Sequence, residues 1–321
     1  MLPNVLRTSA ADHVPVLAEE VRELLAVRPG ETVVDGTFGA GGHSRLLVAD
    51  LRGEGKLVAI DRDPTVKPYF DRVKGVSGGV QTRFLRGDYA VVLAQLAANG
   101  VKADAILLDL GLSSMQVDRP ERGFSYATDA PLDMRMDPSA EVSAADVVNT
   151  RSERDLETIF RNYGEERYAR AIARGIARRR QEQRIERTGQ LVDVVRAAIP
   201  TPARVGEGHP AKRVFQALRI EVNRELESLE TGLPAAFEML RPGGRLAVIS
   251  FHSLEDRIVK RFIAQERRGC ICPPELPICV CGRKPRLAPV GAQPQRPTDA
   301  EVAANPRARS ARLRAARRLD A

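Results

Sequence analysis

Short apolar runs, most of them closed by an aspartate, recur along the first third of the chain. They occupy residues 31–39, 56–63, 80–88 and 103–111, and a further run follows at 243–253. Their Val, Ile and Leu content and their length are typical of strands that are buried on both faces. Segments with helical spacing of apolar residues lie between the first four runs. This alternation predicts an α/β fold with a mainly parallel sheet and helices on both faces.

The periodicity becomes helical from about residue 141 to residue 240. One predicted helix starts after Ser143, which suits an N-cap, and a Gly- and Pro-rich loop follows at 201–210. Because a strand pattern resumes at residue 243, the simplest architecture is a helical insertion within an α/β domain. We expect core segments at 1–130 and 213–266, an insertion at 131–212, and a Pro- and Arg-rich extension at 267–321. The extension is expected to be partly disordered and to end in a segment that packs on the core.

The positive charge of the 321-residue chain is unevenly distributed. The net charge is +8, and residues 267–321 hold 12 Lys and Arg against 4 Asp and Glu. A second cluster places nine arginines between residues 161 and 187. These features are typical of a nucleic-acid-binding surface, although a solvated helix face and a disordered tail would have the same composition. The chain lacks a membrane-spanning apolar run and a signal peptide, so we expect a cytoplasmic protein.

A glycine-rich segment, DGTFGAGGHS at residues 35–44, follows the first predicted strand. Such loops bind dinucleotides, nucleotide phosphates or adenosine-bearing methyl donors. Ser44 stands where the last glycine of a dinucleotide fingerprint would be, and the Gly-Lys pair of a phosphate loop is missing. Asp61 closes the second strand, where a carboxylate can accept both hydroxyls of a ribose. The pattern therefore favours an adenosine ligand, although a tight turn alone would also need glycine.

Aspartates close the first four predicted strands, at Asp35, Asp61, Asp88 and Asp109. In open α/β sheets the carboxyl ends of the strands face the ligand crevice. We therefore expect the four carboxylates near one crevice, with Asp35 bracing the glycine turn from behind.

Nine segments that follow one another in order resemble the ribosomal RNA small-subunit methyltransferase H (MraW-like) family, and the resemblance extends from about residue 13 to 262. They are HVPVLAEEV, DGTFGAGGHS, AIDRDP, LLDLGLSSMQVD, RGFSY, PLDMRMD, FRNYGEERYARAIARGI, HPAKRVFQALRIEVNRELESLE and GGRLAVISFHSLEDRIVKRF. The resemblance implies a Rossmann-like class I methyltransferase that uses S-adenosylmethionine to methylate the N4 amine of a cytosine in 16S ribosomal RNA, near the decoding site. It also implies RNA recognition by the insertion. The expected partner is this RNA or the assembling small subunit. A homodimer is compatible with the sequence, which leaves the oligomeric state open.

The resemblance also implies the donor-binding residues. The family's positions fall on Gly41, Gly42, His43, Asp61, Tyr89, Asp109 and Gln116. Glycine amides would approach the methionine end of the donor, and His43 would donate to its carboxylate. Tyr89 would pack on the adenine, while Asp109 and Gln116 would lie at the methyl-transfer end.

The exocyclic amine of cytosine is a weak nucleophile, so the enzyme must orient it and accept hydrogen bonds from it. Amino-methyltransferases often use a Pro-Pro-aromatic turn after the fourth strand, but this chain has DLGLSS there. Asp109 is the predicted acceptor and catalytic residue.

The segments at 131–137 and 250–257 are polar and flank the predicted crevice. We expect them to line the cytosine pocket and to orient the RNA, through Asp133, Arg135, Asp137, His252 and Ser253. The alternative is that these residues form helix caps and ion pairs, such as Ser253 with Asp256. The aromatics available for base stacking are Phe124, Tyr126 and Tyr163.

All four cysteines lie between residues 270 and 281, as Cys270, Cys272, Cys279 and Cys281. Four thiolates could hold zinc, although C-x-C is a less usual spacing than C-x2-C. No metal is expected in catalysis, and a structural zinc stays an open alternative.

Two further functions remain open at this level. The chain could methylate another nucleic-acid amine, although the missing Pro-Pro-aromatic turn argues against the usual DNA enzymes. It could also be an RNA-binding ribosome assembly factor that retains a donor-binding fold. The intact glycine loop and the crevice acids argue against that reading.

Overall fold

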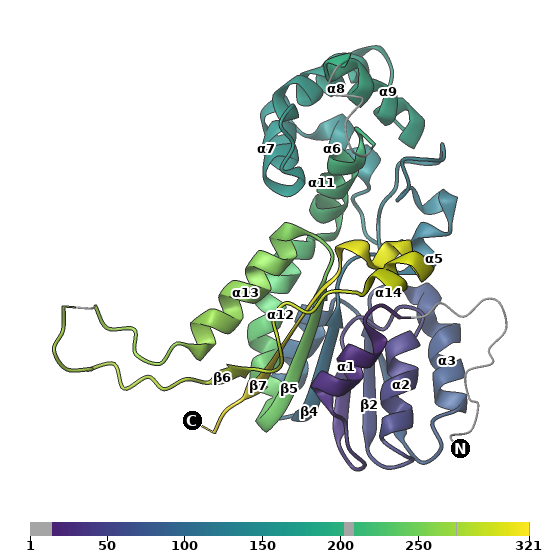
Figure 1. Ribbon diagram of the computed structural model, residues 1–321. Coiled ribbons are helices and arrows are strands. Elements are labelled where there is room, and N and C mark those ends of the chain that lie inside the picture. The colour runs from purple at the N-terminus through teal and green to yellow at the C-terminus, as the bar shows by residue number, and fades with distance from the viewer. Residues whose placement is uncertain (1–14, 202–208, 274, 321) are drawn as a thin grey trace. The chain divides into compact units, whose positions relative to one another are not determined.

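A computed structural model describes residues 15–201, 209–273 and 275–320 (Figure 1). The chain forms two compact units, of which unit 1 comprises residues 1–111 with 228–321 and unit 2 comprises residues 112–227. Among the described helices, none is both long and apolar enough to cross a membrane.

Unit 1 is built on a seven-stranded sheet with the order β3-β2-β1-β4-β5-β7-β6. Strands β1 to β5 pair in parallel, and β7 pairs antiparallel with both β5 and β6. All five predicted strands are confirmed. The strands are β1 (Thr32–Asp35), β2 (Lys56–Asp61), β3 (Gln81–Arg86), β4 (Ala103–Asp109), β5 (Leu240–Ser250), β6 (Leu287–Pro289) and β7 (Arg312–Arg318).

Helices cover both faces of this sheet, as the apolar strands require. Alternate strand residues such as Val34, Ile106 and Val248 join one core cluster with α4, α12 and α13. Their neighbours Val33 and Leu107, also fully buried, point to the other face, where α1 and α2 contact the strands. The helices of this unit are α1 (Ala18–Leu25), α2 (Gly42–Asp50), η1 (Pro64–Val66), α3 (Lys67–Gly75), α4 (Tyr89–Ala98), α12 (Glu225–Met239), α13 (Ser253–Arg267), α14 (Asp299–Ala304) and η3 (Pro306–Ser310).

The C-terminal extension is more ordered than its composition predicted. Strand β7 pairs with β5 from Ser250↔Arg312 to Arg245↔Arg317, so the end of the chain completes the sheet. Arg314 is only 8% exposed, and its Nε lies 2.7 Å from Asp256 Oδ1. This agrees with the expectation that the extension ends in a segment that packs on the core, because the arginines of β7 pair with an acid of α13 and its small apolar residues are buried.

Unit 2 is helical, and its core is a separate hydrophobic cluster. Ser143 caps α6 and forms a capping box with Asp146, as the sequence predicted. The unit extends beyond the predicted boundaries of 131 and 212, because Phe124 and the α11 residues Phe215 and Leu218 pack in its core. Its helices are α5 (Ser114–Val117), η2 (Pro120–Arg122), α6 (Ala144–Thr150), α7 (Glu153–Gly164), α8 (Ala169–Glu182), α9 (Thr188–Ala198) and α11 (Lys212–Asn223).

Candidate functional site

The candidate site of unit 1 lies where the strand order reverses. Strand β1 has β2 on one side and β4 on the other, so the connections after β1 and β4 leave the sheet in opposite directions. The carboxyl ends of parallel strands form a ligand crevice at such a point. The glycine loop between β1 and α2 lies at this edge.

The glycine loop needs glycine for both conformation and space. Gly39 and Gly41 have φ angles of 53° and 76°, in the left-handed region that favours glycine. A Cβ atom on Gly41 would lie 2.6 Å from Phe38 Cζ, and one on Gly36 would lie 2.5 Å from Leu108 Cδ2. Helix α2 begins at Gly42, directly after this loop. The loop therefore places bare backbone at the crevice.

Asp35 supports this loop from inside the protein. It is 1% exposed, and its carboxylate accepts from the Ser44 hydroxyl at 2.7 Å and the Thr37 amide at 3.1 Å. Burial raises its pKa to about 6, and the two hydrogen bonds oppose that rise. Its role as a brace of the turn agrees with the prediction.

Asp61 lies at the carboxyl end of β2, as predicted, and is held in a fixed orientation. Its Oδ2 accepts from the Gly39 amide and its Oδ1 accepts from the Asp63 amide, each at 2.8 Å. Burial raises its pKa to about 6. Each carboxylate oxygen has a second lone pair, so both oxygens can still accept from a diol.

Asp88 and Tyr89 make more contacts within the protein than predicted: Asp88 binds neighbouring side chains and backbone, and Tyr89 packs in the core. Asp88 caps α4 through the Ala90 amide at 2.7 Å, accepts from the Ser228 hydroxyl at 2.6 Å and pairs with Arg62. Asp88 thus fastens α4 and α12 to the sheet, and a ligand would have to compete with these partners. Tyr89 is 8% exposed and lies in the core cluster, against Gly232.

Asp109 and His43 form the most unusual pair of the crevice. His43 Nε2 lies 3.6 Å from Asp109 Oδ2, which is too long for a hydrogen bond. Within the part of the chain that is described, His43 Nε2 and Asp109 Oδ1 are buried without a hydrogen-bond partner. Buried polar atoms are normally satisfied, so this pair indicates a ligand-binding position.

The environment sets the protonation of both groups. Burial lowers the pKa of His43 to about 4, although a hydrogen bond to the Val16 backbone opposes the shift. The pKa of Asp109 is raised well above its usual value, first by burial and then by the charges of Asp35 and Glu255. The neutral imidazole of His43 thus faces the carboxyl group of Asp109, whose ionised form is disfavoured. A cation bound nearby would favour that ionised form.

The turn after β5 is organised by His252 rather than by Ser253. His252 is the N-cap of α13, and Glu255 completes the capping box. The alternative interpretation expected Ser253 and Asp256 to cap this helix, but the N-cap is His252, and Asp256 accepts from Arg312 and Arg314 of β7. His252 Nε2 lies 3.2 Å from Glu255 Oε1 but outside hydrogen-bond geometry, so this nitrogen also has no partner among the described residues.

A polar pocket of about 320 Å³ lies beside this turn, within unit 1. Two of its arginines, Arg296 and Arg309, are exposed and have no hydrogen-bond or ion-pair partner in the described ranges. The sequence marked the C-terminal segment as basic but did not single out these two arginines, because only the pairing of β7 with β5 brings the segment to this turn. The lining residues are Phe251, His252, Ser253, Arg296, Arg309, Ser310, Ala311 and Arg312.

The other predicted residues belong to unit 2. Gln116 is 5% exposed, and its Oε1 accepts from the Ser113 amide at 3.2 Å. Arg135 forms a forked ion pair with Asp133, with Nη2 2.6 Å from Oδ2 and Nε 3.0 Å from Oδ1. Asp137 accepts from the amide and hydroxyl of Ser139. Asp133, Arg135 and Asp137 thus satisfy one another or their own loop, as the alternative interpretation expected.

Thr37 is a crevice residue that the sequence interpretation missed. Its Oγ1 accepts from the Asp109 amide at 2.5 Å, so it ties the end of β4 to the loop after β1. Its place inside the glycine motif was the only signal available.

The chain is similar in sequence to proteins of one named family. A crystal structure of a putative rRNA methylase from Clostridium thermocellum is similar over 96% of this chain and 100% of that chain, at 11% identity and a TM-score of 0.43, which is too weak to add to the fold described above. The chain is 51% identical over 310 residues to the ribosomal RNA small subunit methyltransferase H of Heliobacterium modesticaldum, covering 96% of this chain and 98% of the relative.

The corresponding protein of Syntrophotalea carbinolica is 52% identical over 311 residues, covering 96% of this chain and 98% of the relative. A family model described as the MraW methylase family matches residues 10–319. The chain therefore belongs to the MraW methylase family and is a methyltransferase.

Proposed function

We propose that this protein transfers a methyl group from S-adenosylmethionine to the exocyclic N4 amine of a cytosine in small-subunit ribosomal RNA, near the decoding site, in the cytoplasm. The observation that carries the proposal is the pair of unpartnered polar atoms on His43 and Asp109, at the switch point of the sheet. A glycine loop and a strand-ending aspartate flank this pair, and together these features suit an adenosine-bearing donor. The names of the relatives support ribosomal RNA as the substrate.

Each donor-binding role follows from the local chemistry. Asp61 accepts the ribose hydroxyls with its remaining lone pairs, and the backbone at Gly41 and Gly42 admits the methionine end. For His43 we propose a different role from donation to the donor's carboxylate. Its ring already donates to the Val16 backbone and is neutral, so Nε2 offers a lone pair. That lone pair suits the donor's α-ammonium, whereas the carboxylate needs an N–H group. Tyr89 is proposed to complete the site of unit 1 at the adenine, and the role of Gln116, which belongs to unit 2, stays a prediction.

Asp109 is the proposed catalytic residue. The bound donor supplies an electrophilic methyl group and a positive charge. The positive charge lowers the pKa of Asp109 and so favours its ionised form. The carboxylate then accepts a hydrogen bond from the cytosine amine. The N4–methyl bond forms as the sulfur–methyl bond breaks, and the amine loses a proton to this acceptor. The products are N4-methylcytidine and S-adenosylhomocysteine.

Two basic surfaces are proposed to bind the RNA backbone. In unit 1, the pocket beside His252 and Ser253 presents Arg296 and Arg309, which have no competing acid among the described residues. In unit 2, exposed arginines at positions 170, 174 and 178 follow one another at four-residue spacing along α8. Since α8 buries its apolar face, these arginines form one solvent-facing stripe that suits phosphates.

The predicted RNA contacts of Asp133, Arg135 and Asp137 remain a prediction. Their mutual hydrogen bonds favour a positioning role, in which they shape the loop rather than touch the target base.

The decisive experiment compares nucleosides of small-subunit ribosomal RNA from cells with and without the gene. Loss of one N4-methylcytidine, restored by the wild-type gene and not by Asp109→Asn, would support the proposal. An unchanged nucleoside profile would refute it. Calorimetry with S-adenosylmethionine separates the remaining alternatives, because an assembly factor without donor binding would show no heat, whereas an enzyme for another nucleic-acid amine would bind the donor and leave this RNA unmodified.

A further inference from the structure

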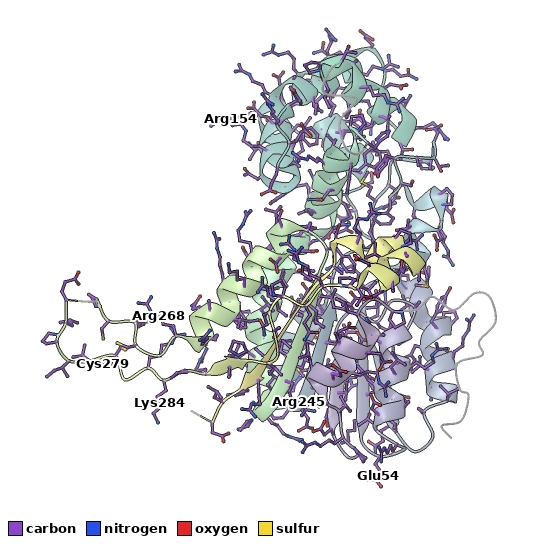
Figure 2. The ribbon with its side chains drawn as sticks, in the orientation of Figure 1. Glu54, Arg154, Arg245, Arg268, Cys279 and Lys284 are labelled. Carbon is purple, nitrogen blue, oxygen red and sulfur yellow. The ribbon has the colours of Figure 1, made fainter. Side chains whose placement is uncertain are left out.

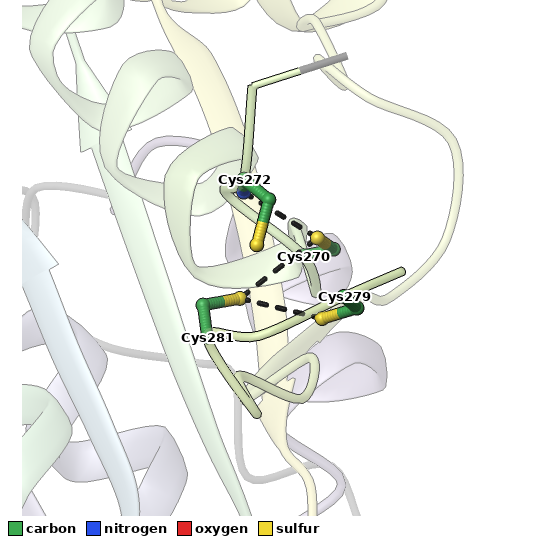
Figure 3. A group of neighbouring side chains, drawn as sticks. All are labelled: Cys270, Cys272, Cys279 and Cys281. Carbon is green, nitrogen blue, oxygen red and sulfur yellow. Dashed lines mark hydrogen bonds between the residues drawn. The ribbon is translucent and has the colours of Figure 1, made fainter. Parts of the chain in front are cut away.

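The segment between α13 and β6 carries every cysteine of the chain. It leaves the end of α13 at Arg267 and returns to the sheet at Leu287. Figures 1 and 2 show this arm extending away from the sheet of its own unit, with Cys279 between Arg268 and Lys284 along it. The arm turns back on itself, so that its two C-x-C pairs, which are separated by six residues, face each other (Figure 3).

The four sulfur atoms are spaced as ligands of one ion would be. All of them lie within 4.8 Å of one another. The Sγ atoms of Cys279 and Cys281 are 3.6 Å apart, and those of Cys281 and Cys270 are 3.8 Å apart. A tetrahedral ion with sulfur bonds of about 2.3 Å separates its ligands by about 3.8 Å. A disulfide would need about 2.05 Å, and all four cysteines are free thiols.

The surroundings of the sulfurs suit thiolates. The Cys272 amide donates to Cys270 Sγ at 3.4 Å, and the Ile271 amide donates to Cys281 Sγ at 3.5 Å. Such donors orient and stabilise metal-bound sulfur. Four thiolates around a divalent ion leave a net charge of about −2, and the basic residues Arg268, Arg283 and Lys284 lie on the same arm. Arg268 also donates to the Cys270 carbonyl at 3.2 Å.

Packing alone does not hold the tip of the arm. Ile278 and Val280 are 74% and 76% exposed, and Ile271 is 52% exposed. Ion pairs of Arg283 and Arg286 with Glu266 fasten the base of the arm to α13, but they do not reach the tip. A segment that buries so little apolar surface needs a cross-link to keep one conformation.

We propose that Cys270, Cys272, Cys279 and Cys281 bind one structural zinc ion, which closes the tip of this arm. Four protein ligands fill a tetrahedral site, so no position is left for water or substrate, and the ion has no part in methyl transfer. Soft thiolates select zinc over the hard cations magnesium and calcium.

The first test measures metal content by mass spectrometry, on full-length protein purified without a histidine tag and without added metal. We expect about one zinc per wild-type chain and at least about a tenfold loss in the double variant Cys270→Ser/Cys281→Ser. Ile278→Ser is the matched control, because it changes an exposed, non-ligating residue of the same arm and should keep the zinc. Stoichiometric iron, or no metal in wild-type protein, would overturn the proposal.

A second test does not depend on how the variants fold. Wild-type protein is treated with a chelator, and its thiols are counted with a chromogenic disulfide reagent before and after treatment. We expect four thiols that react slowly before treatment and quickly after it, with slow reaction restored by one equivalent of zinc. Cobalt(II) in place of zinc should give the visible absorption bands of tetrahedral sulfur coordination. Disulfides in the freshly purified protein, or equally fast thiols with and without chelator, would refute the zinc site.

Discussion

The glycine-loop crevice of unit 1 and the 131–137 loop of unit 2 look alike in sequence and differ in how their polar groups are satisfied. Both combine acids with a basic side chain in a short polar segment. In the crevice, His43 Nε2 and Asp109 Oδ1 are buried and have no partner among the described residues. In the loop, Arg135 is bound to Asp133 through two nitrogens and to the Ala140 carbonyl through a third.

This difference separates a binding site from a structural network. A buried polar atom without a partner costs roughly 1–3 kcal/mol, which a fold tolerates where a ligand later supplies the partner. The forked ion pair of Arg135 with Asp133, whose side chains are about one-quarter exposed, has no such energetic cost. The density of charged residues does not show which of the two segments is the better candidate for a binding site. The buried atoms without hydrogen-bond partners identify the crevice.

The sharpest test of this contrast replaces one acid in each segment. Asp109→Asn should lower the single-turnover rate of methyl transfer by about 10²–10⁴-fold, because the acceptor for the amine proton is lost. Asp133→Asn should stay within about threefold of wild type. Calorimetric affinity for S-adenosylmethionine, measured on both variants, distinguishes lost donor binding from lost chemistry. Equal losses of the methyl-transfer rate in the two variants would show that the 131–137 loop is as important for the reaction as the crevice.

The protonation of His43 gives a second test. Because its folded pKa of about 4 lies below the ordinary value of 6.5, the unfolded chain binds more protons between these pH values. Stability is therefore lost as the pH falls from 6.5 to 4. Asp35 and Asp61, with pKa values raised to about 6, act in the opposite direction between pH 6 and 3.8.

The contribution of His43 is isolated by comparing wild type with His43→Gln. The variant should lose about 3 kcal/mol less free energy of unfolding over that pH range, at 1.36 kcal/mol for each pH unit between the two pKa values. Chemical denaturation at several pH values measures this difference. His209→Gln, which removes a half-buried histidine of unit 2, should retain most of the wild-type loss. An unchanged pH dependence in His43→Gln would show that the crevice histidine is not held neutral.

At the glycine loop, the energetic cost of a left-handed backbone conformation can be measured separately from the cost of steric overlap with neighbouring side chains. Gly41 and Gly100 have nearly equal φ angles of 76° and 74°, but only Gly41 has neighbours in the way of a Cβ atom. Gly100→Ala should cost about 1–2 kcal/mol for the left-handed conformation. Gly41→Ala should cost about 1–3 kcal/mol more and should weaken donor binding, because Phe38 must move. Equal costs in thermal unfolding would mean that the loop adapts freely.

The smallest expected effect belongs to the ion pair of the 131–137 loop. A double-mutant cycle of Asp133→Ala and Arg135→Ala should give a coupling energy of about 1 kcal/mol or less in the free energy of unfolding. The affinity for a small-subunit RNA fragment should change little, since the pair is engaged with itself. A large loss of RNA affinity in Arg135→Ala alone would instead support direct contact with the substrate.

Local patterns were sufficient for much of the sheet and of the crevice. Buried parallel strands are continuous apolar runs, and their order with the helices between them leaves few topologies, so β1 to β5 could be predicted. The positions of Asp35 and Asp61 followed because strand ends and glycine turns are read from neighbouring residues. The role of Asp88 could not be predicted, since its partners Arg62 and Ser228 lie 26 and 140 residues away.

The sequence by itself thus determined the α/β class, the glycine loop with its aspartates, and the resemblance to a methyltransferase family. Only the tertiary structure decided which polar groups are left without partners, that β7 completes the sheet beside β5, and that arginines of the C-terminal segment reach the turn at His252. It also decided that two C-x-C pairs face each other across the arm. The physical reason is that periodicity and turn chemistry act over a few residues, whereas hydrogen-bond satisfaction and ligand geometry depend on segments that only folding brings together.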